Sequence, residues 1–322
     1  MRMVFKELYE KFRADKILEI KPSTKALHAL NWKLLAPKIG EKNISEFGRP
    51  EARLLLAELL ESGLSPKTAK DRMAFIKQML LFAATVLEIK IRPTAWGLKY
   101  PEGQPRKIQS FTESEMLRIV RHSVDEISDG RVTLLPVLLS ILTGMRIGET
   151  LGLQWGDIDW MRNIINIRRN VVKAYDPETK SDRFFVGTPK TKQGYREIPL
   201  LPTLRKTLRT IGGKSPVNDF YVVGNSDSPK ANNTVRETYS RFLKKYNLPK
   251  INFHGLRHTY ATLLVESGGD IKTISTLLGH SKVSLTLDLY VHPSIDSKRK
   301  AVNKAFRKLR QTTKERRNDK EN

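Results

Sequence analysis

Residues 142–153 read Leu-Thr-Gly-Met-Arg-Ile-Gly-Glu-Thr-Leu-Gly-Leu, so an arginine and a glutamate stand inside an apolar stretch. The preceding residues, 132–142, are apolar enough for a buried helix, and Gly144 allows close backbone approach. Arg146 is a planar, bidentate donor suited to two phosphate oxygens. A buried Arg146–Glu149 pair that only joins two helices is the structural alternative.

The residues around this stretch predict helices with a small antiparallel sheet between them. Thr112-Glu-Ser-Glu115 is a capping box that opens a helix upstream. Three downstream segments have β-rich composition: Ile164–Val172, Arg183–Gly187 and Glu197–Leu200. Three short amphipathic segments then predict helices: Asn252–Gly268, Ile271–Leu278 and Val283–Tyr290.

Residues 1–100 predict a small helical bundle. Apolar residues recur at helical spacing in a run from Pro22 (Leu27, Leu30, Leu34, Leu35) and in Glu51–Leu60 (Leu54, Leu55, Leu59, Leu60). A third helix begins at the N-cap Ser65, with Pro66 at its first position, and its buried face would hold Met73, Ile76, Met79, Leu80, Ala83 and Leu87. Lys67, Lys70 and Lys77 lie mostly off that face. They can contact a DNA backbone or simply form an exposed charged face.

Composition narrows the function further. A chain of 322 residues favours two domains, and the absence of cysteine excludes disulfides, thiolate metal sites and cysteine nucleophiles. No apolar stretch approaches the roughly 18 residues of a membrane span, and no secretory signal opens the chain, so a cytoplasmic location is expected. The net charge of +24 makes nucleic acid the leading partner, with a merely solvated basic surface as the alternative.

Two further motifs carry polar residues among apolar ones. Phe253-His-Gly-Leu-Arg-His-Thr-Tyr260 places His254 and Arg257 on one helical face. His254 and His258 have the spacing of a metal-ligand pair, but no glutamate stands between them, and no metal is expected. In Leu277-Leu-Gly-His280, His280 follows a glycine, and Tyr290 lies ten residues later. By themselves, a helix-capping histidine and a core tyrosine are the structural alternatives.

Together these motifs resemble the tyrosine recombinase (phage integrase) family, whose pattern is Arg, Lys, His-x-x-Arg, His, then Tyr. Order and spacing both fit, with Lys190 supplied by Thr188-Pro-Lys-Thr-Lys-Gln-Gly-Tyr-Arg-Glu-Ile198. The implied catalytic set is Arg146, Lys190, His254, Arg257, His280 and Tyr290. The resemblance covers residues 110–293 by motif and, more weakly, the amino-terminal helices.

The resemblance implies that Tyr290 attacks a DNA phosphorus to give a 3′-phosphotyrosyl intermediate, with no cofactor. Arg146 and Arg257 would stabilise the transition state, and Glu149 would orient Arg or His. His254 resembles the general acid/base, and His280 a donor to the transition state. Lys190 would protonate the leaving 5′-oxygen, but Lys192 would project from the same side of an extended segment and stays open.

The implied fold is mainly α with a small antiparallel sheet. Residues 1–100 would form a helical, SAM-like core-binding domain, 101–110 a linker with basic Arg106 and Lys107 as DNA contacts, and 111–293 the α+β catalytic domain. Residues 294–322 form a basic tail. Its stripe of Ala301, Val302, Ala305, Phe306 and Leu309 can dock on a neighbouring protomer or pack on its own catalytic domain.

These features predict a site-specific integrase that acts on double-stranded DNA through a Holliday junction, for integration and excision of a mobile element. Expected partners are three further copies in a homotetramer on DNA, with a monomer or weak oligomer in free solution, and accessory DNA-bending or directionality proteins. A Xer-type recombinase that resolves chromosome dimers is the first alternative, since no separate amino-terminal arm-binding domain is recognisable. A type IB topoisomerase and a non-catalytic basic DNA-binding protein are the others.

Overall fold

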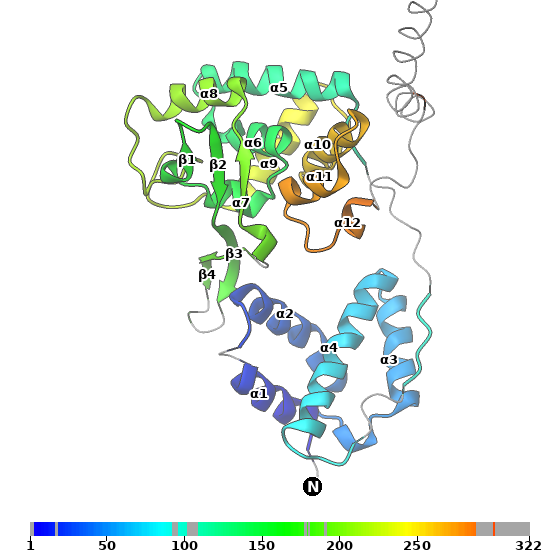
Figure 1. Ribbon diagram of the computed structural model, residues 1–322. Helices are drawn as coiled ribbons and strands as arrows, with labels where there is room; N and C mark the ends of the chain where they lie inside the picture. Colours follow the sequence, from blue (N-terminus) through cyan, green and yellow to red (C-terminus); the bar gives the residue numbers. More distant parts are fainter. Residues whose placement is uncertain are drawn as a thin grey trace, which may run out of the picture. The chain divides into compact units, whose positions relative to one another are not determined.

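The computed structural model describes residues 3–16, 19–91, 96–101, 109–176, 179, 181–189, 192–287 and 299 (Figure 1). The chain divides into two compact units, with boundaries at 107/108, 172/173 and 185/186. The first unit holds the amino-terminal helices together with residues 173–185, and the second holds the rest. Each unit has its own hydrophobic core.

The amino-terminal helices pack around α4, which contacts the other three. They are α1 (Phe5–Lys16), α2 (Pro22–Ile39), α3 (Arg49–Glu61) and α4 (Pro66–Thr85), with a 3₁₀ turn η1 at Ile44–Glu46. As predicted, α4 begins at Ser65, whose Oγ accepts a hydrogen bond from the Thr68 amide at 3.2 Å. Its predicted apolar stripe from Met73 to Ala83 is buried. Trp96, in the segment after the helices, also packs into this core.

The leucine stripe predicted for α2 was wrong. Leu27, Leu30 and Leu34 are 53%, 52% and 46% exposed, and only Leu35 of that set is buried. The inward face instead carries polar Asn31, which accepts a hydrogen bond from buried Arg72 of α4 at 2.7 Å. Hydrophobic periodicity misses such a face because it takes buried residues to be apolar. In α3, Leu54 likewise faces outward while Leu56 is buried.

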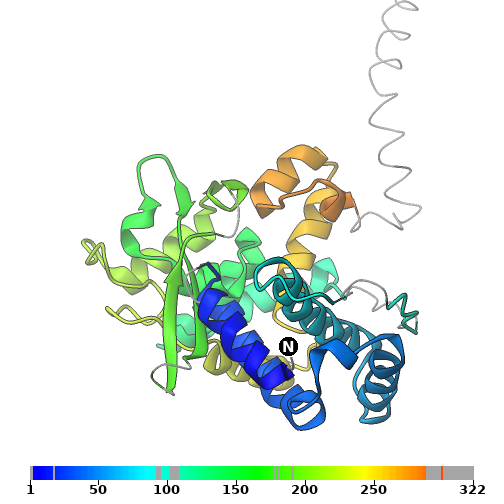
Figure 2. The same cartoon turned by 90° about the horizontal axis from the view of Figure 1, so that it is seen from below.

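The core of the second unit is built around a fully buried helix, α6 (Leu135–Thr143), which follows the 3₁₀ turn η2 (Val132–Leu134). Helix α5 (Glu113–Ser128) packs on it and begins with the predicted capping box between Thr112 and Glu115. Helix α10 (His254–Glu266) also packs on α6. Helices α10 and α11 (Ile271–Leu278) lie side by side in both views (Figures 1 and 2).

The structure describes further helices in this unit, and they are not confined to its surface. They are α7 (Ile147–Gly152), η3 (Trp155–Asp157), η4 (Lys192–Gly194), α8 (Pro202–Gly212), α9 (Asn232–Lys245) and α12 (Ser284–Leu287). Among the described residues, no helix has the length and apolar character to span a membrane.

The strands form two small antiparallel assemblies. One sheet has the order β1-β2-β5, with β1 at Ile158–Asp159, β2 at Ile164–Ile167 and β5 at Arg196–Pro199. The second is a pair, β3 (Asn170–Asp176) and β4 (Ser181–Gly187). The single strand predicted over 164–172 is therefore divided. Its break lies where Arg169 turns to bind Asp157, a carboxylate that is 1% exposed, at 2.5 Å. The predicted class, mainly α with a small antiparallel sheet, is confirmed.

Gly144 ends α6 and turns the chain toward Arg146. Its φ is +68°, in the left-handed region that favours glycine, and its amide donates to the Ser140 carbonyl. A Cβ at this position would lie 2.6 Å from the Tyr260 ring and 3.0 Å from a methyl carbon of Leu278. The turn that presents Arg146 is therefore pressed directly against α10 and α11.

We expect Gly144→Ala to destabilise the protein more than Gly63→Ala, a matched control at φ +84° with nothing within 4 Å of its Cβ. Gly63→Ala should cost only the left-handed backbone penalty, about 1–2 kcal/mol. Gly144→Ala should add about 1–3 kcal/mol for the overlap with Tyr260 and Leu278. Urea denaturation of both variants measures the difference, and equal losses would contradict the packing described for Gly144.

Candidate active site

Arg146 occupies the N-cap position of α7, where its backbone and side chain both bind Glu149. The Arg146 amide donates to Glu149 Oε2 at 2.9 Å, and Nη1 donates to Oε1 at 2.9 Å. Nη2 reaches the carbonyl of Gly279 at 3.2 Å. The side chain remains 38% exposed. Arg146 is thus fixed at three points and still open to a ligand from solvent.

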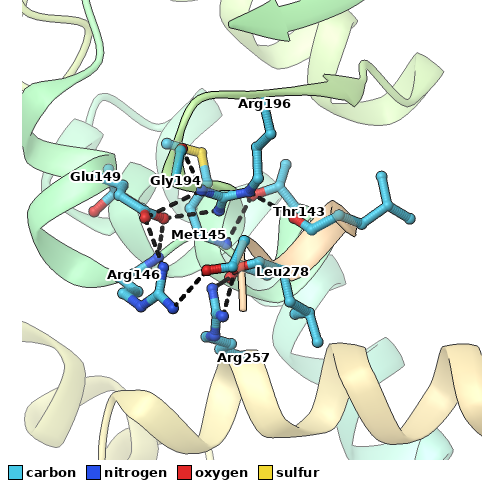
Figure 3. Close-up of polar contacts among 12 residues, drawn as sticks. Thr143, Met145, Arg146, Glu149, Gly194, Arg196, Arg257 and Leu278 are labelled. Atoms are coloured by element: carbon cyan, nitrogen blue, oxygen red, sulfur yellow. Dashed lines mark hydrogen bonds and ion pairs between the residues drawn. The ribbon is translucent and has the colours of Figure 1, made fainter. Parts of the chain in front are cut away.

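Glu149 is a buried carboxylate shared by two arginines. Its side chain is 4% exposed, and Arg196 of β5 binds it with Nη1 to Oε1 at 3.1 Å and Nη2 to Oε2 at 2.8 Å (Figure 3). Burial by itself would raise the pKa of Glu149, but the hydrogen bonds from Arg196 and the charge of Arg146 hold it below its usual value. Glu149 is therefore ionised and holds both guanidinium groups in fixed directions.

Arg257 lies almost completely inside the protein, 2% exposed, on the first turns of α10. Nη1 donates to the carbonyl of Gly144 at 2.7 Å. Nη2 donates to the carbonyl of Leu278 at 2.5 Å (Figure 3). Burial and then repulsion from Arg146 lower the pKa of Arg257 to about 9. A bound anion would offset both effects, because it would compensate the buried charge of Arg257 and reduce its repulsion from Arg146.

The pKa values of three histidines in this region are all lowered. The pKa of His254 is lowered to about 4, chiefly by desolvation and further by repulsion from His258 and Arg257. The pKa of His280 is likewise lowered to about 4, by desolvation and by Arg257 and Arg146. The pKa of His258 is also lowered by burial. This residue, to which the sequence assigned no role, packs edge-to-face on His254 with ring centroids 4.6 Å apart.

The structure thus brings together five of the residues selected from the sequence, namely Arg146, Glu149, His254, Arg257 and His280. Lys67, Lys70 and Lys77 lie exposed on α4, in the other unit. Five other predictions fall outside the described residues: Lys190, Tyr290, Arg106, Lys107 and the tail at 294–322, apart from residue 299. The side chain of Lys192 is also not described, although its backbone belongs to η4.

The electrostatics of the cluster suit a phosphate. Among the described residues, three guanidinium groups (Arg146, Arg196, Arg257) surround one carboxylate (Glu149), which leaves two positive charges without a neighbouring counter-charge. A cavity of about 740 Å³ opens beside His254, and Arg236 and Lys250 are among its lining residues. In the part of the chain described, no group of three or more metal-ligating side chains could hold an ion.

Sequence reasoning missed Arg196. The signal was present, because Arg196 and Ile198 stand two apart in a strand and therefore share a face, and Ile198 is an obvious core residue. It also missed the carbonyls of Gly144, Leu278 and Gly279, which accept hydrogen bonds from the arginines. Backbone acceptors carry no sequence signature.

A highly basic chain that gathers arginines and histidines at one place suits a partner rich in phosphate groups, such as DNA. The model of the Phage integrase family matches residues 109–296, more than half of the chain. The tyrosine recombinase XerC-like protein of Caldanaerobacter subterraneus subsp. tengcongensis is 31% identical over 270 residues, which cover 76% of this chain and 67% of that protein. The chain therefore belongs to the phage integrase family of tyrosine recombinases, enzymes that cleave DNA and transfer its strands.

Other relatives and structures agree with this family. The transposase of transposon Tn916 from Enterococcus faecalis is 24% identical, with 92% of this chain and 76% of that protein covered. The ICEBs1 integrase of Bacillus subtilis is 27% identical, and the match covers 79% of this chain and 67% of that protein. The fold matches the Tn1549 transposon integrase in complex with a circular intermediate DNA, at a TM-score of 0.74 and 21% identity, over 94% of this chain and 99% of that one. It also matches a lambda integrase dimer bound to a core site, at a TM-score of 0.63 and 18% identity, over 89% and 77%.

We expect His254 and His280 to stay neutral in the free protein down to about pH 5, because both pKa values lie near 4. Unfolding would restore a pKa of about 6.5, so the unfolded chain binds more protons between these values. The free energy of unfolding should therefore fall as the pH drops from about 6.5 toward 4.

Titration of the imidazole nitrogens by NMR, with His254→Asn and His280→Asn to assign the signals, measures both pKa values. Midpoints near 6.5 for these two rings would contradict the desolvated site described above.

Proposed function

We propose that this protein is the integrase of a mobile genetic element, which cuts and rejoins two duplexes at specific sites through a 3′-phosphotyrosyl intermediate and a Holliday junction. The observation that carries the catalytic part is the arrangement of Arg146 and Arg257, which both bind the segment 278–279 just before His280. Similarity to the Tn916 transposase and the ICEBs1 integrase supports the mobile-element role.

In this proposal the Tyr290 oxygen attacks the DNA phosphorus as the bond to the 5′-oxygen breaks. The phosphodiester energy is kept in the new phosphotyrosyl bond, so rejoining needs no external energy source. Arg146 and Arg257 neutralise the charge that builds on the non-bridging oxygens. Lys190, or in the alternative Lys192, gives a proton to the leaving 5′-oxygen.

In this proposal, the two neutral histidines have different roles in the cleavage step. A neutral His254 can accept the Tyr290 proton, as the family's general acid/base does, and return it when the strand is rejoined. His280 can donate a hydrogen bond to a non-bridging oxygen while neutral, so it adds no positive charge to a site already rich in arginine.

DNA contacts in this proposal extend beyond the catalytic cluster. Lys67, Lys70 and Lys77 are all exposed on α4, and the Lys70 ammonium lies 5.6 Å from the Tyr100 ring centroid. Exposed lysines bind phosphates by releasing counterions. Arg106 and Lys107 remain proposed contacts in the linker. The cavity with Arg236 and Lys250 offers further positive charge beside His254.

The proposed domain division and assembly are those expected from the sequence. Residues 1–100 bind core DNA, 101–110 link the domains, 111–293 carry the chemistry, and the tail at 294–322 docks on a neighbouring protomer. The active assembly is a homotetramer on DNA in the cytoplasm, with accessory DNA-bending or directionality proteins. A tail that packs on its own domain is the alternative.

A Xer-type role is the second candidate function, because several relatives carry that name. They include the XerC-like protein of Caldanaerobacter and the tyrosine recombinase XerC of Bacillus pumilus, which is 26% identical over 81% of this chain. A type IB topoisomerase would share the same catalytic residues but would relax any supercoiled plasmid, with no specific site.

We expect the protein to form a covalent complex with a nicked suicide substrate that carries its recombination site, and Tyr290→Phe to abolish it. Arg146→Ala and Arg257→Ala should each slow complex formation by about 10²–10³-fold, because each removes a charged donor to the transition state. Gel separation of the covalent product gives the rates.

The surface variant Lys214→Ala, at an exposed position of the second unit, serves as the control for general damage. Lys190→Ala and Lys192→Ala, compared in the same assay, identify the lysine that protonates the leaving group. If Tyr290→Phe still forms the covalent complex at the normal rate, Tyr290 is not the nucleophile.

The mobile-element role predicts that the enzyme recombines the two ends of the DNA segment that carries its gene. A plasmid with the attachment-like direct repeats flanking that segment should lose the intervening DNA when the enzyme and any accessory factor are added. A plasmid with a single chromosomal palindromic site near a replication terminus is the comparison. Recombination at the palindrome alone would favour the Xer-type role, and site-independent relaxation the topoisomerase.

A further inference from the structure

Arg196 is a deeply buried arginine that the proposed chemistry does not use. Its side chain is 2% exposed at the start of β5. Besides its two bonds to Glu149, Nε donates to the carbonyl of Leu277 at 2.6 Å, and Nη1 donates to the carbonyl of Gly194 at 3.2 Å. These four hydrogen bonds use most of the five N–H donors of a guanidinium.

The four bonds reach three separate segments, and each segment carries a residue of the proposed site. Glu149 belongs to the turn of α7 that holds Arg146. Gly194 ends η4, which begins at Lys192. Leu277 lies near the end of α11, three residues before His280. Arg196 is therefore the point at which these three segments meet.

The backbone of Gly279 packs closely against the Arg196 side chain. A Cβ on Gly279 would lie 3.0 Å from Arg196 Nη1 and 3.2 Å from its Cδ. Gly279 is the residue whose carbonyl binds Arg146. The guanidinium thus contacts, on one side, the carboxylate that aims Arg146 and, on the other, the turn that accepts a hydrogen bond from Arg146.

We propose that Arg196 is a positioning residue for DNA cleavage, which acts through Glu149 and the 277–279 turn to hold Arg146 in its reactive direction. This inference rests on the role proposed above for Arg146. Arg196 is too deeply buried to touch DNA, and its donors point to protein acceptors. Its contribution is the fixed geometry of its neighbours, which a transition state requires within fractions of an ångström.

The planar fork of arginine is essential to this role. A lysine at position 196 would keep the positive charge beside Glu149 but would place it at one nitrogen, without the paired bonds to both carboxylate oxygens. One nitrogen cannot occupy the three positions from which Nε, Nη1 and Nη2 of Arg196 donate. Glu149 would stay ionised, and Arg146 would lose its fixed direction.

We expect Arg196→Lys to slow single-turnover cleavage at saturating protein by about 10–100-fold, by analogy with the groups that orient metal ligands through hydrogen bonds. DNA affinity, measured by salt-matched titration, should change by less than about threefold, because Arg196 makes no contact that DNA can reach. The matched control is Arg162→Lys. Arg162 forms the same bidentate pair with Glu197, but the two side chains are 61% and 51% exposed, so this change should leave cleavage unaltered.

The decisive measurement repeats Arg196→Lys in an Arg146→Lys background. If Arg196 acts through Arg146, its substitution should cost less than about threefold there, because the interaction it supports has already been lost. A merely structural role would cost the same factor in both backgrounds and would overturn the proposal. Unchanged cleavage by Arg196→Lys in the wild-type background would overturn it as well.

Glu149→Gln provides a second route if Arg196→Lys does not fold. It keeps the size of the side chain but replaces one acceptor oxygen by a donor, and it should show the same loss and the same dependence on Arg146. Equal losses in both backgrounds would again count against the proposal. If Arg146→Ala itself cleaves at the normal rate, the proposed function fails. If Arg146→Ala is slow while Arg196→Lys and Glu149→Gln are normal, only the positioning role of Arg196 fails.

Discussion

The buried carboxylate of Glu149 is the interaction on which the rest of the site depends. A charge that is 4% exposed is tolerated only with close partners of opposite charge. Glu149 has two, Arg146 and Arg196, which come from a helix cap and from a strand 47 residues further along the chain. Satisfying one carboxylate therefore requires α7 and β5 to meet at one place, and it aligns Arg146 as a consequence.

The ends of two helices complete this arrangement. Helices α6 and α11 both end at a glycine with positive φ, at Gly144 and Gly279. The last carbonyls of a helix have no partner within the helix and carry the negative end of its dipole. The arginines supply the missing donors: Arg257 binds the carbonyls of Gly144 and Leu278, and Arg146 binds that of Gly279. The same carbonyls thus satisfy their own hydrogen-bonding needs and orient the guanidinium groups.

The site as a whole carries more positive than negative charge, and its histidines His254 and His280 are neutral. Burial lowers the pKa values of His254 and His280, and the positive charge left by three arginines around one carboxylate lowers them further, to about 4. A phosphate that binds between the arginines would offset the part of this shift that comes from their charge.

Much of the molecule follows from local signals in the sequence. The capping box at Thr112, the cap at Ser65 and the apolar stripe of α4 are confirmed because they depend on residues close in the chain. Where a buried face is polar, as at Asn31 and Arg72, the periodicity of apolar residues pointed to the wrong side of α2.

The sequence by itself determined the class of fold and the family, because motif order and residue type are properties of the chain. Only the tertiary structure decided how Arg146 is held, since its supports are Glu149, the distant Arg196 and a carbonyl of the 277–279 turn. In the sequence, only its spacing of two from Ile198 indicates that Arg196 faces inward. Its role emerges only when folding removes it from water and leaves protein acceptors as its partners.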